Sequence, residues 1–317
     1  FNEITKSAIK EAFKNPKEID LDLVDAYQAR RALDYLFGFT LSPVLWQTLP
    51  RTKSAGRVQS VALKLLAERE IAIEAFKKEE YWTIEVKLIS NAGIEFIAEL
   101  KVLAGKKLKK FDINTKTLAD SAVKEIFESK LHVDSIEKKR TKRFPSKPFI
   151  TSTLQQEASR KLGFSAKRTM SVAQNLYQGV DIKGESIGLI TYMRTDSVSL
   201  SNAAISDCRK LILDRFGDKY LPGTANIYKN KNSHAQEAHE AIRPTNPLIH
   251  PEDILDQLDY DQNRLYDLIW KRTIASQMHN AEYDQVSTNI NSLDDKIVLR
   301  ASGSITVFNG FTKIYTE

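Results

Sequence analysis

The sequence predicts a multidomain protein of the α+β class, and three observations carry that prediction. Residues 1–77 and 144–278 place apolar residues at the three- and four-residue spacing of amphipathic helices. Residues 78–143 and 279–317 instead alternate apolar and polar residues, as half-buried strands do. With 317 residues, the chain is long enough for two or three domains with their own cores. We therefore expect two helical parts and one β-rich part that the chain enters twice.

Composition excludes several classes of protein. Hydrophobic residues at 42% and charged residues at 28% are typical of a globular chain rather than a disordered one. The net charge of +6 is compatible with nucleic acid as a partner but is weak evidence for it. No apolar run is long enough to cross a membrane, and no signal peptide opens the sequence. The one cysteine, Cys208, excludes an internal disulfide and favours core packing. Because the chain starts at Phe1 without methionine, we interpret it as an excised fragment.

Three helices are expected in residues 1–77. Thr5 can cap a first helix that ends before Asn15-Pro16. A second helix spans residues 21–37 and closes at Gly38. The aspartates at its start suit helix initiation better than a metal site. A third helix follows the small residues 54–56.

Two polar clusters in these helices are candidate anion sites. Arg30 shares a helical face with Asp34, so it is either a structural ion pair or a phosphate-binding group, and Arg31 adds charge beside it. Small residues before the third helix leave its N–H groups open to an anion, with Arg57 and Gln59 nearby. An ordinary capped helix is the alternative.

The β-rich part should begin with two strands, at residues 82–88 and 94–100, and a helix at residues 117–130. A basic run at residues 138–143 precedes two closely spaced prolines. We expect an extended connector there, which marks a domain boundary and a hinge. The alternative for such a charge run is a solvated edge. Three further strands are expected at residues 286–290, 296–301 and 305–316.

The second helical part contains a helix-turn-helix arrangement. A helix over residues 153–162 is followed by Gly163-Phe164, and Ser165 caps a helix over residues 166–177. A short buried strand should end at Leu189-Ile190.

Tyr192 and Arg194 follow that strand and form the candidate reactive centre. Strand alternation would point both side chains to the same face. A phenol has a pKa of about 10, so it is a weak nucleophile until its phenolate is stabilised. A guanidinium can stabilise it and can also hold a phosphate. From this stretch alone, a tyrosine packed in the core remains the alternative.

His239 and Arg243 lie one helical turn apart, with Glu240 between them. The arrangement briefly suggests a zinc protease. Arg243 occupies the position where the second histidine would stand, so we reject a metal site.

Six segments in fixed order together resemble bacterial DNA topoisomerase I, of the type IA class. They are FNEIT (residues 1–5), QARR (28–31), SAGRVQS (54–60), PFITSTLQQEA (148–158), YMRTDS (192–197) and EAHEAIRP (237–244).

The resemblance implies roles for individual residues. Tyr192 matches the nucleophile that attacks a DNA phosphodiester, keeps the 5′-phosphate and releases a 3′-hydroxyl. Arg194 matches the arginine that positions the tyrosine or the scissile phosphate, and His239 a histidine that contacts DNA phosphate. Arg243 is expected to add a phosphate contact. The residues that match the lining of the single-strand groove are Arg30, Arg31, Asp34, Ser54, Arg57 and Gln59.

The resemblance also implies an architecture and a cofactor. Residues 1–77 would be part of a helical base, residues 78–143 and 279–317 a β-rich arch, and residues 144–278 a helix-turn-helix (CAP-like) domain with the tyrosine, arranged as a torus. The family's Toprim domain, which holds Mg²⁺, is absent, so the chain itself should bind no metal. We expect no strand passage by the chain alone, although it should bind DNA. The implied whole enzyme is a monomer of the bacterial cytoplasm and nucleoid. It needs no ATP, because the phosphotyrosine conserves the bond energy, and it acts on single-stranded segments of negatively supercoiled DNA.

Two other classes of protein stay in view. A tyrosine recombinase also gathers arginines, a histidine and a tyrosine around a phosphate, but its link is to a 3′-phosphate, and motif order disfavours it. A non-catalytic single-strand-binding or helix-turn-helix module is the second alternative. The polarity of a trapped covalent adduct separates all three.

Overall fold

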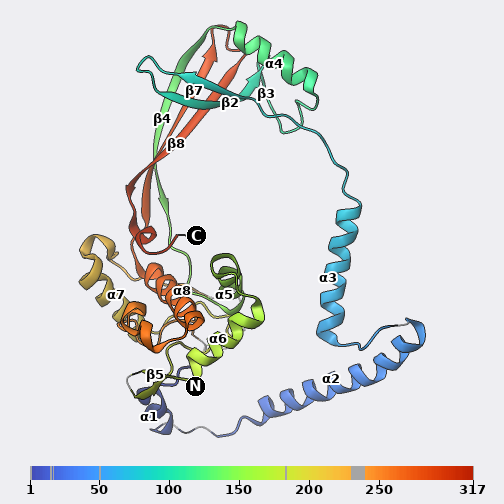
Figure 1. Ribbon diagram of the computed structural model, residues 1–317, viewed down its shortest axis with the longest axis vertical. Coiled ribbons are helices and arrows are strands. Elements are labelled where there is room, and N and C mark those ends of the chain that lie inside the picture. The colour runs from blue at the N-terminus through green and yellow to red at the C-terminus, as the bar shows by residue number, and fades with distance from the viewer. Residues whose placement is uncertain are drawn as a thin grey trace. The chain divides into compact units, whose positions relative to one another are not determined.

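The structure is a computed structural model that describes residues 2–14, 16, 18–49, 51–182, 184–229 and 240–316. The chain divides into two compact units, each described by itself (Figure 1). The first contains Phe1–Asn15, Glu85–Lys107 and Glu128–Glu317. The second contains Pro16–Ile84 and Leu108–Phe127. Helices and an antiparallel sheet are both present, as the predicted α+β class requires. The four-domain division stays a prediction.

A six-stranded antiparallel sheet belongs to the first unit and has the order β1-β2-β8-β7-β4, with β3 paired to β2. Two separate regions of the sequence supply its strands, because β1 to β4 precede the helical part and β7 and β8 follow it. The strands are β1 Glu85–Ile89, β2 Glu95–Leu103, β3 Lys106–Lys107, β4 Leu131–Arg143, β7 Ala281–Ser292 and β8 Val298–Phe308.

The basic run at residues 138–143 is not the predicted connector. It is the second half of strand β4, which pairs with β7 as far as Arg143 opposite Ala281. Asp284 on β7 lies 2.5 Å from Arg140 Nε and 3.1 Å from Lys138 Nζ. These contacts place a carboxylate beside two of the five basic side chains, which lowers the charge repulsion within the strand. The strand predicted at residues 305–316 is also wrong beyond Phe308, where β8 ends and a 3₁₀ turn, Gly310–Lys313, begins.

The first unit also contains helices. Helix α1, Lys6–Lys14, has the predicted cap, since Thr5 Oγ1 accepts a hydrogen bond from the Ala8 N–H. The predicted helix-turn-helix is confirmed: α5 and a π-helical turn lead through Gly163 at φ 71° into α6, which Ser165 caps. The bounds are α5 Thr151–Glu157, the π-turn Ala158–Leu162, α6 Ala166–Gln178, hairpin β5 Val180–Ile182 with β6 Glu185–Ile187, α7 Asn202–Phe216 and α8 Tyr260–Gln277, with 3₁₀ turns at Asp218–Tyr220 and Pro251–Gln257.

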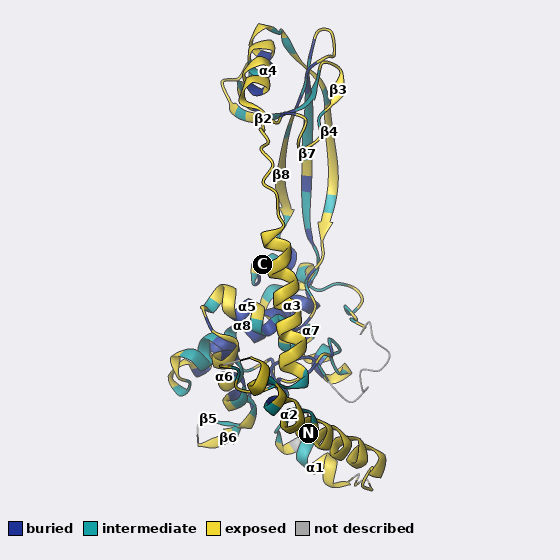
Figure 2. Ribbon diagram, turned by 90° about the vertical axis from the view of Figure 1, so that its right-hand side faces the viewer, coloured by how far each residue is buried: buried dark blue, intermediate teal, exposed yellow. Residues whose placement is uncertain are grey.

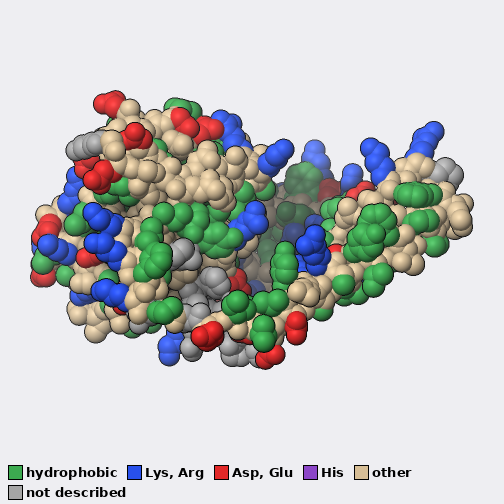
Figure 3. All heavy atoms as spheres, turned by 90° about the horizontal axis from the view of Figure 1, so that it is seen from below, with side chains coloured by type: hydrophobic (Ala, Val, Ile, Leu, Met, Phe, Trp, Pro, Cys, Tyr) green, Lys and Arg blue, Asp and Glu red, His purple; other side chains and the backbone are tan. Residues whose placement is uncertain are grey.

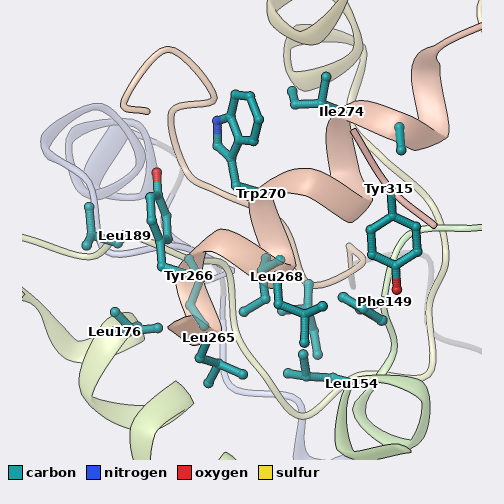
Figure 4. Packing of buried hydrophobic residues seen from close by; sticks show 14 of the residues in the cluster. Phe149, Leu154, Leu176, Leu189, Leu265, Tyr266, Leu268, Trp270, Ile274 and Tyr315 are labelled. Atoms are coloured by element: carbon teal, nitrogen blue, oxygen red, sulfur yellow. The ribbon is translucent and has the colours of Figure 1, made fainter. Parts of the chain in front are cut away.

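Helix α8 forms the centre of the hydrophobic core of this unit (Figure 4). Trp270 and Tyr266 are fully buried, and each finds a backbone acceptor, at Pro247 O and Ile249 O, both 2.8 Å away. Cys208 on α7 is buried in the same core, as predicted, and burial raises the pKa of its thiol to about 12.

The second unit contains α2 Leu21–Thr48, α3 Arg57–Glu74 and most of α4, Lys116–Glu128. Helix α2 does not close at Gly38 as predicted but continues through Gly38 and Pro43. A glycine costs a helix about 1 kcal/mol, which does not force its end. Ser42 Oγ donates to Gly38 O within this stretch, and also accepts the Ala55 N–H that precedes α3. Most side chains of α2 and α3 are exposed (Figure 2).

No helix among the described residues is long and apolar enough to cross a membrane.

Candidate active site around Tyr192

The backbone around Tyr192 lies between two other segments of the first unit. On one side, the Tyr192 N–H donates to Asn2 O at 2.8 Å and the Gly188 N–H to Ile4 O at 3.4 Å. On the other side, the Thr191 N–H donates to Arg243 O at 2.9 Å. We call residues 188–192 the tyrosine segment, residues 2–5 its N-terminal flank and residues 240–245 its C-terminal flank.

The tyrosine segment is not the regular buried strand that the sequence predicted. Strand β6 ends at Ile187, and beyond it only an isolated bridge joins Ile190 to Pro244. Burial nevertheless alternates: Thr191, Met193 and Thr195 are buried, Tyr192 is partly buried and Arg194 is exposed. Tyr192 and Arg194 therefore both occupy the less buried positions of this alternation, as expected, although the backbone here is not a regular strand.

Two threonine hydroxyls, one buried and one partly buried, bond the backbone on either side of Tyr192. Thr191 Oγ1 donates to Ala241 O at 2.7 Å and accepts the Arg243 N–H at 2.9 Å. Beyond Tyr192, Thr151 Oγ1 at the start of α5 donates to Met193 O at 2.8 Å and accepts the Thr195 N–H at 2.9 Å. The backbone before and after Tyr192 is thereby held to two different parts of the chain.

The Tyr192 ring packs against a second tyrosine. The Tyr177 ring on α6 meets it edge to face, with centroids 5.3 Å apart and an interplanar angle of 65°. Burial, and next the nearby Tyr192, raise the pKa of the Tyr177 hydroxyl. Tyr192 also contacts the hydrophobic core, so part of the packing interpretation holds. A partly buried ring with fixed backbone on both sides leaves the hydroxyl few orientations.

Arg243 differs from the expectation of a DNA contact. It is 6% exposed. Its Nε and Nη2 donate to Glu240 Oε2 at 2.9 and 2.5 Å, and Nη2 also to Glu3 Oε2 at 3.1 Å. Its Nη1 donates to Pro244 O at 2.9 Å. A guanidinium turned toward protein acceptors in this way does not present itself to a phosphate.

His239 lies outside the described residues, as do residues 230–238 before it. Its expected role stays a prediction.

The predicted groove residues all belong to the second unit. Arg57 Nε lies 2.5 Å from Asp34 Oδ1, so the ion pair considered for Arg30 is made by Arg57 instead. The hydrogen bond from Arg57, aided by the charges of Arg57 and Arg30, holds the pKa of the Asp34 carboxyl below its usual value.

Arg30 and Arg31 on α2 are exposed, as are Ser54 before α3 and Gln59 in its first turn. The N-cap residue of α3 is Gly56, which has no side chain to cap the helix, and the anion site proposed there stays a prediction. Figure 3 shows Lys and Arg side chains among apolar side chains on the surface of helix α2.

Comparison with known proteins decides the family. A family model described as DNA topoisomerase matches residues 18–317. This chain belongs to the DNA topoisomerase family. The DNA topoisomerase 1 of Rickettsia bellii is 56% identical over 317 residues, which are all of this chain and 40% of that protein. The DNA topoisomerase 1 of Xylella fastidiosa (strain Temecula1) is 49% identical over 321 residues, covering all of this chain and 39% of that protein.

A solved structure of a topoisomerase has a similar fold. Full-length topoisomerase I from Thermotoga maritima superposes with a TM-score of 0.83 and 41% identity, covering all of this chain and 50% of that one. The resemblance to bacterial DNA topoisomerase I and the predicted fold class are thereby confirmed. The chain spans about two fifths of the length of the curated relatives it matches.

Among the described residues, no group of three or more His, Cys, Asp or Glu side chains could hold a metal ion.

Sequence reasoning missed three residues that shape the site: Glu3, Thr151 and Tyr177. Glu3 and Thr151 lie in two of the segments that carry the family resemblance. The sequence therefore pointed to these segments but did not indicate what the two side chains contact. Tyr177 had no signal beyond its place at the end of α6.

Proposed function

We propose that this chain is the nucleophile-bearing part of a type IA DNA topoisomerase. Tyr192 would cut one DNA strand through a 5′-phosphotyrosyl intermediate, allow strand passage, and permit rejoining without ATP, which relaxes negative supercoils. The main support for the proposal is the environment of Tyr192. It is partly buried, and its own N–H and the hydroxyls of Thr191 and Thr151 hold the backbone around it.

The chemistry follows from the groups at this site. The Tyr192 oxygen attacks the phosphorus of a phosphodiester, forms an O–P bond and expels the 3′-oxygen of the preceding nucleotide. The phenol proton leaves to a base, and the 3′-oxygen takes up a proton as it departs. Exposed Arg194, two residues on, is suited to neutralise charge on the phosphoryl oxygens. Rejoining reverses these steps, so no external energy source is needed.

Fixed backbone around the nucleophile favours this reaction for a physical reason. A phenol with a pKa of about 10 is deprotonated unfavourably at neutral pH, and this cost already raises the activation free energy. An additional entropic cost of ordering the ring would slow the reaction further. The hydrogen bonds to Thr191 and Thr151 restrict the Tyr192 backbone before substrate arrives. His239 is proposed to contact a DNA phosphate near the same centre.

The remaining properties are proposed for the longer protein. Single-stranded DNA would follow the exposed arginines of α2 and the Arg57–Asp34 pair. Magnesium dependence would come from residues outside this chain, where the metal assists rejoining. We further propose a monomer that acts on chromosomal DNA in the bacterial cytoplasm.

The test is a chimera in which these 317 residues replace the aligned part of the Rickettsia bellii protein. A strand labelled at either end is incubated with the chimera, and the reaction is stopped in denaturant. Electrophoresis should show a protein adduct that keeps the label downstream of the cut and loses the 5′ label. Tyr192→Phe should abolish this adduct, whereas the matched control Tyr177→Phe should retain it.

Two outcomes would contradict the proposal. An adduct through a 3′-phosphate would favour the recombinase chemistry. Binding without any adduct, in a chimera that is folded, would favour the non-catalytic single-strand-binding module.

A further inference from the structure

One buried arginine and two partly buried glutamates form a charged cluster beside the tyrosine segment. The Arg243 side chain is 7% exposed, and those of Glu240 and Glu3 are 15% and 21% exposed. A guanidinium has five N–H donors. In Arg243, Nε and Nη2 turn to Glu240 and Glu3, while Nη1 turns to Pro244 O and, at 3.4 Å, to Thr245 O. Every donor thus has a protein acceptor in its direction.

The members of this cluster come from both flanks of the tyrosine segment. Glu3 belongs to the N-terminal flank, whose carbonyls at Asn2 and Ile4 accept the N–H groups of Tyr192 and Gly188. Arg243 belongs to the C-terminal flank, whose backbone bonds Thr191. The 3.1 Å contact between Glu3 and Arg243 therefore joins the two flanks across the segment that carries Tyr192.

Glu240 is the third member of the cluster and connects it to the start of α7. Its Oε1 accepts the Ser201 N–H at 2.6 Å, at the cap of α7, while its Oε2 bonds Arg243. If Glu3 loses its charge, Arg243 keeps a carboxylate partner in Glu240, so no buried charge is left unpaired. Glu3 can thus be neutralised without the severe penalty of an orphaned guanidinium.

Close approach of the N-terminal flank depends on a glycine. A Cβ at Gly188 would lie 3.0 Å from Ile4 O and 2.6 Å from Tyr177 O. The flank is therefore seated directly on the tyrosine segment, and Glu3 is the charged side chain of that flank that reaches Arg243.

We propose that Glu3, acting through Arg243, is a positioning residue for Tyr192. It clamps the N-terminal flank against the tyrosine segment and so keeps the Tyr192 backbone in place for attack. The proposal rests on Tyr192 being the nucleophile. It assigns Arg243 to the protein interior rather than to DNA.

Amide hydrogen exchange in the whole 317-residue chain tests the clamp without DNA. In Glu3→Gln, the Gly188 and Tyr192 amides should exchange roughly tenfold faster, because a charge-assisted contact that holds their acceptors is weakened. The Thr191 amide, which bonds the other flank, and the amides of α8 should keep their rates. Glu11→Gln, on α1 in an exposed ion pair with Lys14, is the matched control and should change nothing. Unchanged rates at Gly188 and Tyr192, or equal acceleration throughout the chain, would overturn the clamp.

Adduct formation in the chimera tests the consequence for chemistry. Glu3→Gln should slow adduct formation roughly tenfold at saturating DNA while leaving the DNA Kd unchanged, as expected for lost positioning rather than lost binding. Glu3→Asp, which keeps the charge, should recover part of the rate, and Glu11→Gln should behave as wild type. A wild-type rate in Glu3→Gln would refute this inference alone. Absence of any Tyr192 adduct in the wild-type chimera would refute the proposed function as well, so the two failures are distinguishable.

Discussion

Thr191→Val removes one hydroxyl from the hydrogen bonds that hold the residue before Tyr192. Valine keeps the shape of the side chain, and Thr191 is 1% exposed, so water cannot replace the lost partner. Two bonds disappear: the donation to Ala241 O at 2.7 Å and the acceptance of the Arg243 N–H at 2.9 Å. Each partner left unsatisfied in the interior costs about 1–3 kcal/mol. Allowing about 1 kcal/mol for the added methyl group, we expect the free energy of unfolding to fall by about 3 kcal/mol.

Urea unfolding followed by tryptophan fluorescence measures this loss. Of the three tryptophans, Trp270 is 2% exposed, whereas Trp46 and Trp82 are 57% and 38% exposed. The blue-shifted emission of Trp270 therefore reports the unit that contains Thr191. The matched control is Thr306→Val at an exposed position of β8 in the same unit, where a change within about 0.5 kcal/mol is expected. If Thr191→Val were as stable as the control, the threonine would not anchor the tyrosine segment.

The other predictions concern DNA binding and the buried thiol. With Arg243 engaged in the interior, four arginines (Arg30, Arg31, Arg57 and Arg194) are the proposed phosphate contacts, so log affinity for single strands should fall against log salt with a slope of about −2.8. A slope near zero would exclude a basic groove, and one of about −3.5 would mean that Arg243 binds DNA after all. Arg57→Ala should reduce the slope by about 0.7, whereas Lys53→Ala should leave it unchanged, and equal effects would indicate diffuse charge. Cys208, with its thiol pKa raised to about 12, stays protonated at pH 8 and should resist iodoacetamide in the folded chain but react in urea. Rapid native labelling at that pH would contradict its burial.

Features with local causes were predictable from the sequence. Thr5 and Ser165 cap their helices through hydrogen bonds to residues three positions on, so a short window of sequence contains both partners. The glycine turn at Gly163 and the core position of Cys208 follow from equally local patterns. Tyr192 and Arg194 could be singled out because a tyrosine and an arginine at that spacing need more than packing to explain them.

Features with distant causes were not predictable. The basic run of β4 forms a strand because Asp284, 144 residues beyond Arg140, lies beside it in the sheet. Helix α2 continues past Gly38 partly because its Ser42 bonds the chain thirteen residues on, at Ala55. The ion pair between Arg243 and Glu3 could not be predicted, because the two residues lie 240 positions apart in the sequence. Such pairings are set by the fold, and no local pattern contains them.

The most direct test of Tyr192 as the nucleophile is the identity of the residue that becomes linked to DNA. The adduct of the chimera is trapped in denaturant, digested with nuclease and trypsin, and analysed by mass spectrometry. Trypsin should release residues 184–194, in which Tyr192 is the one tyrosine. We expect this peptide to carry a nucleotide that is linked through its 5′-phosphate to Tyr192. A nucleotide linked through its 3′-phosphate, or one carried by the Tyr177 peptide at residues 169–183, would contradict it.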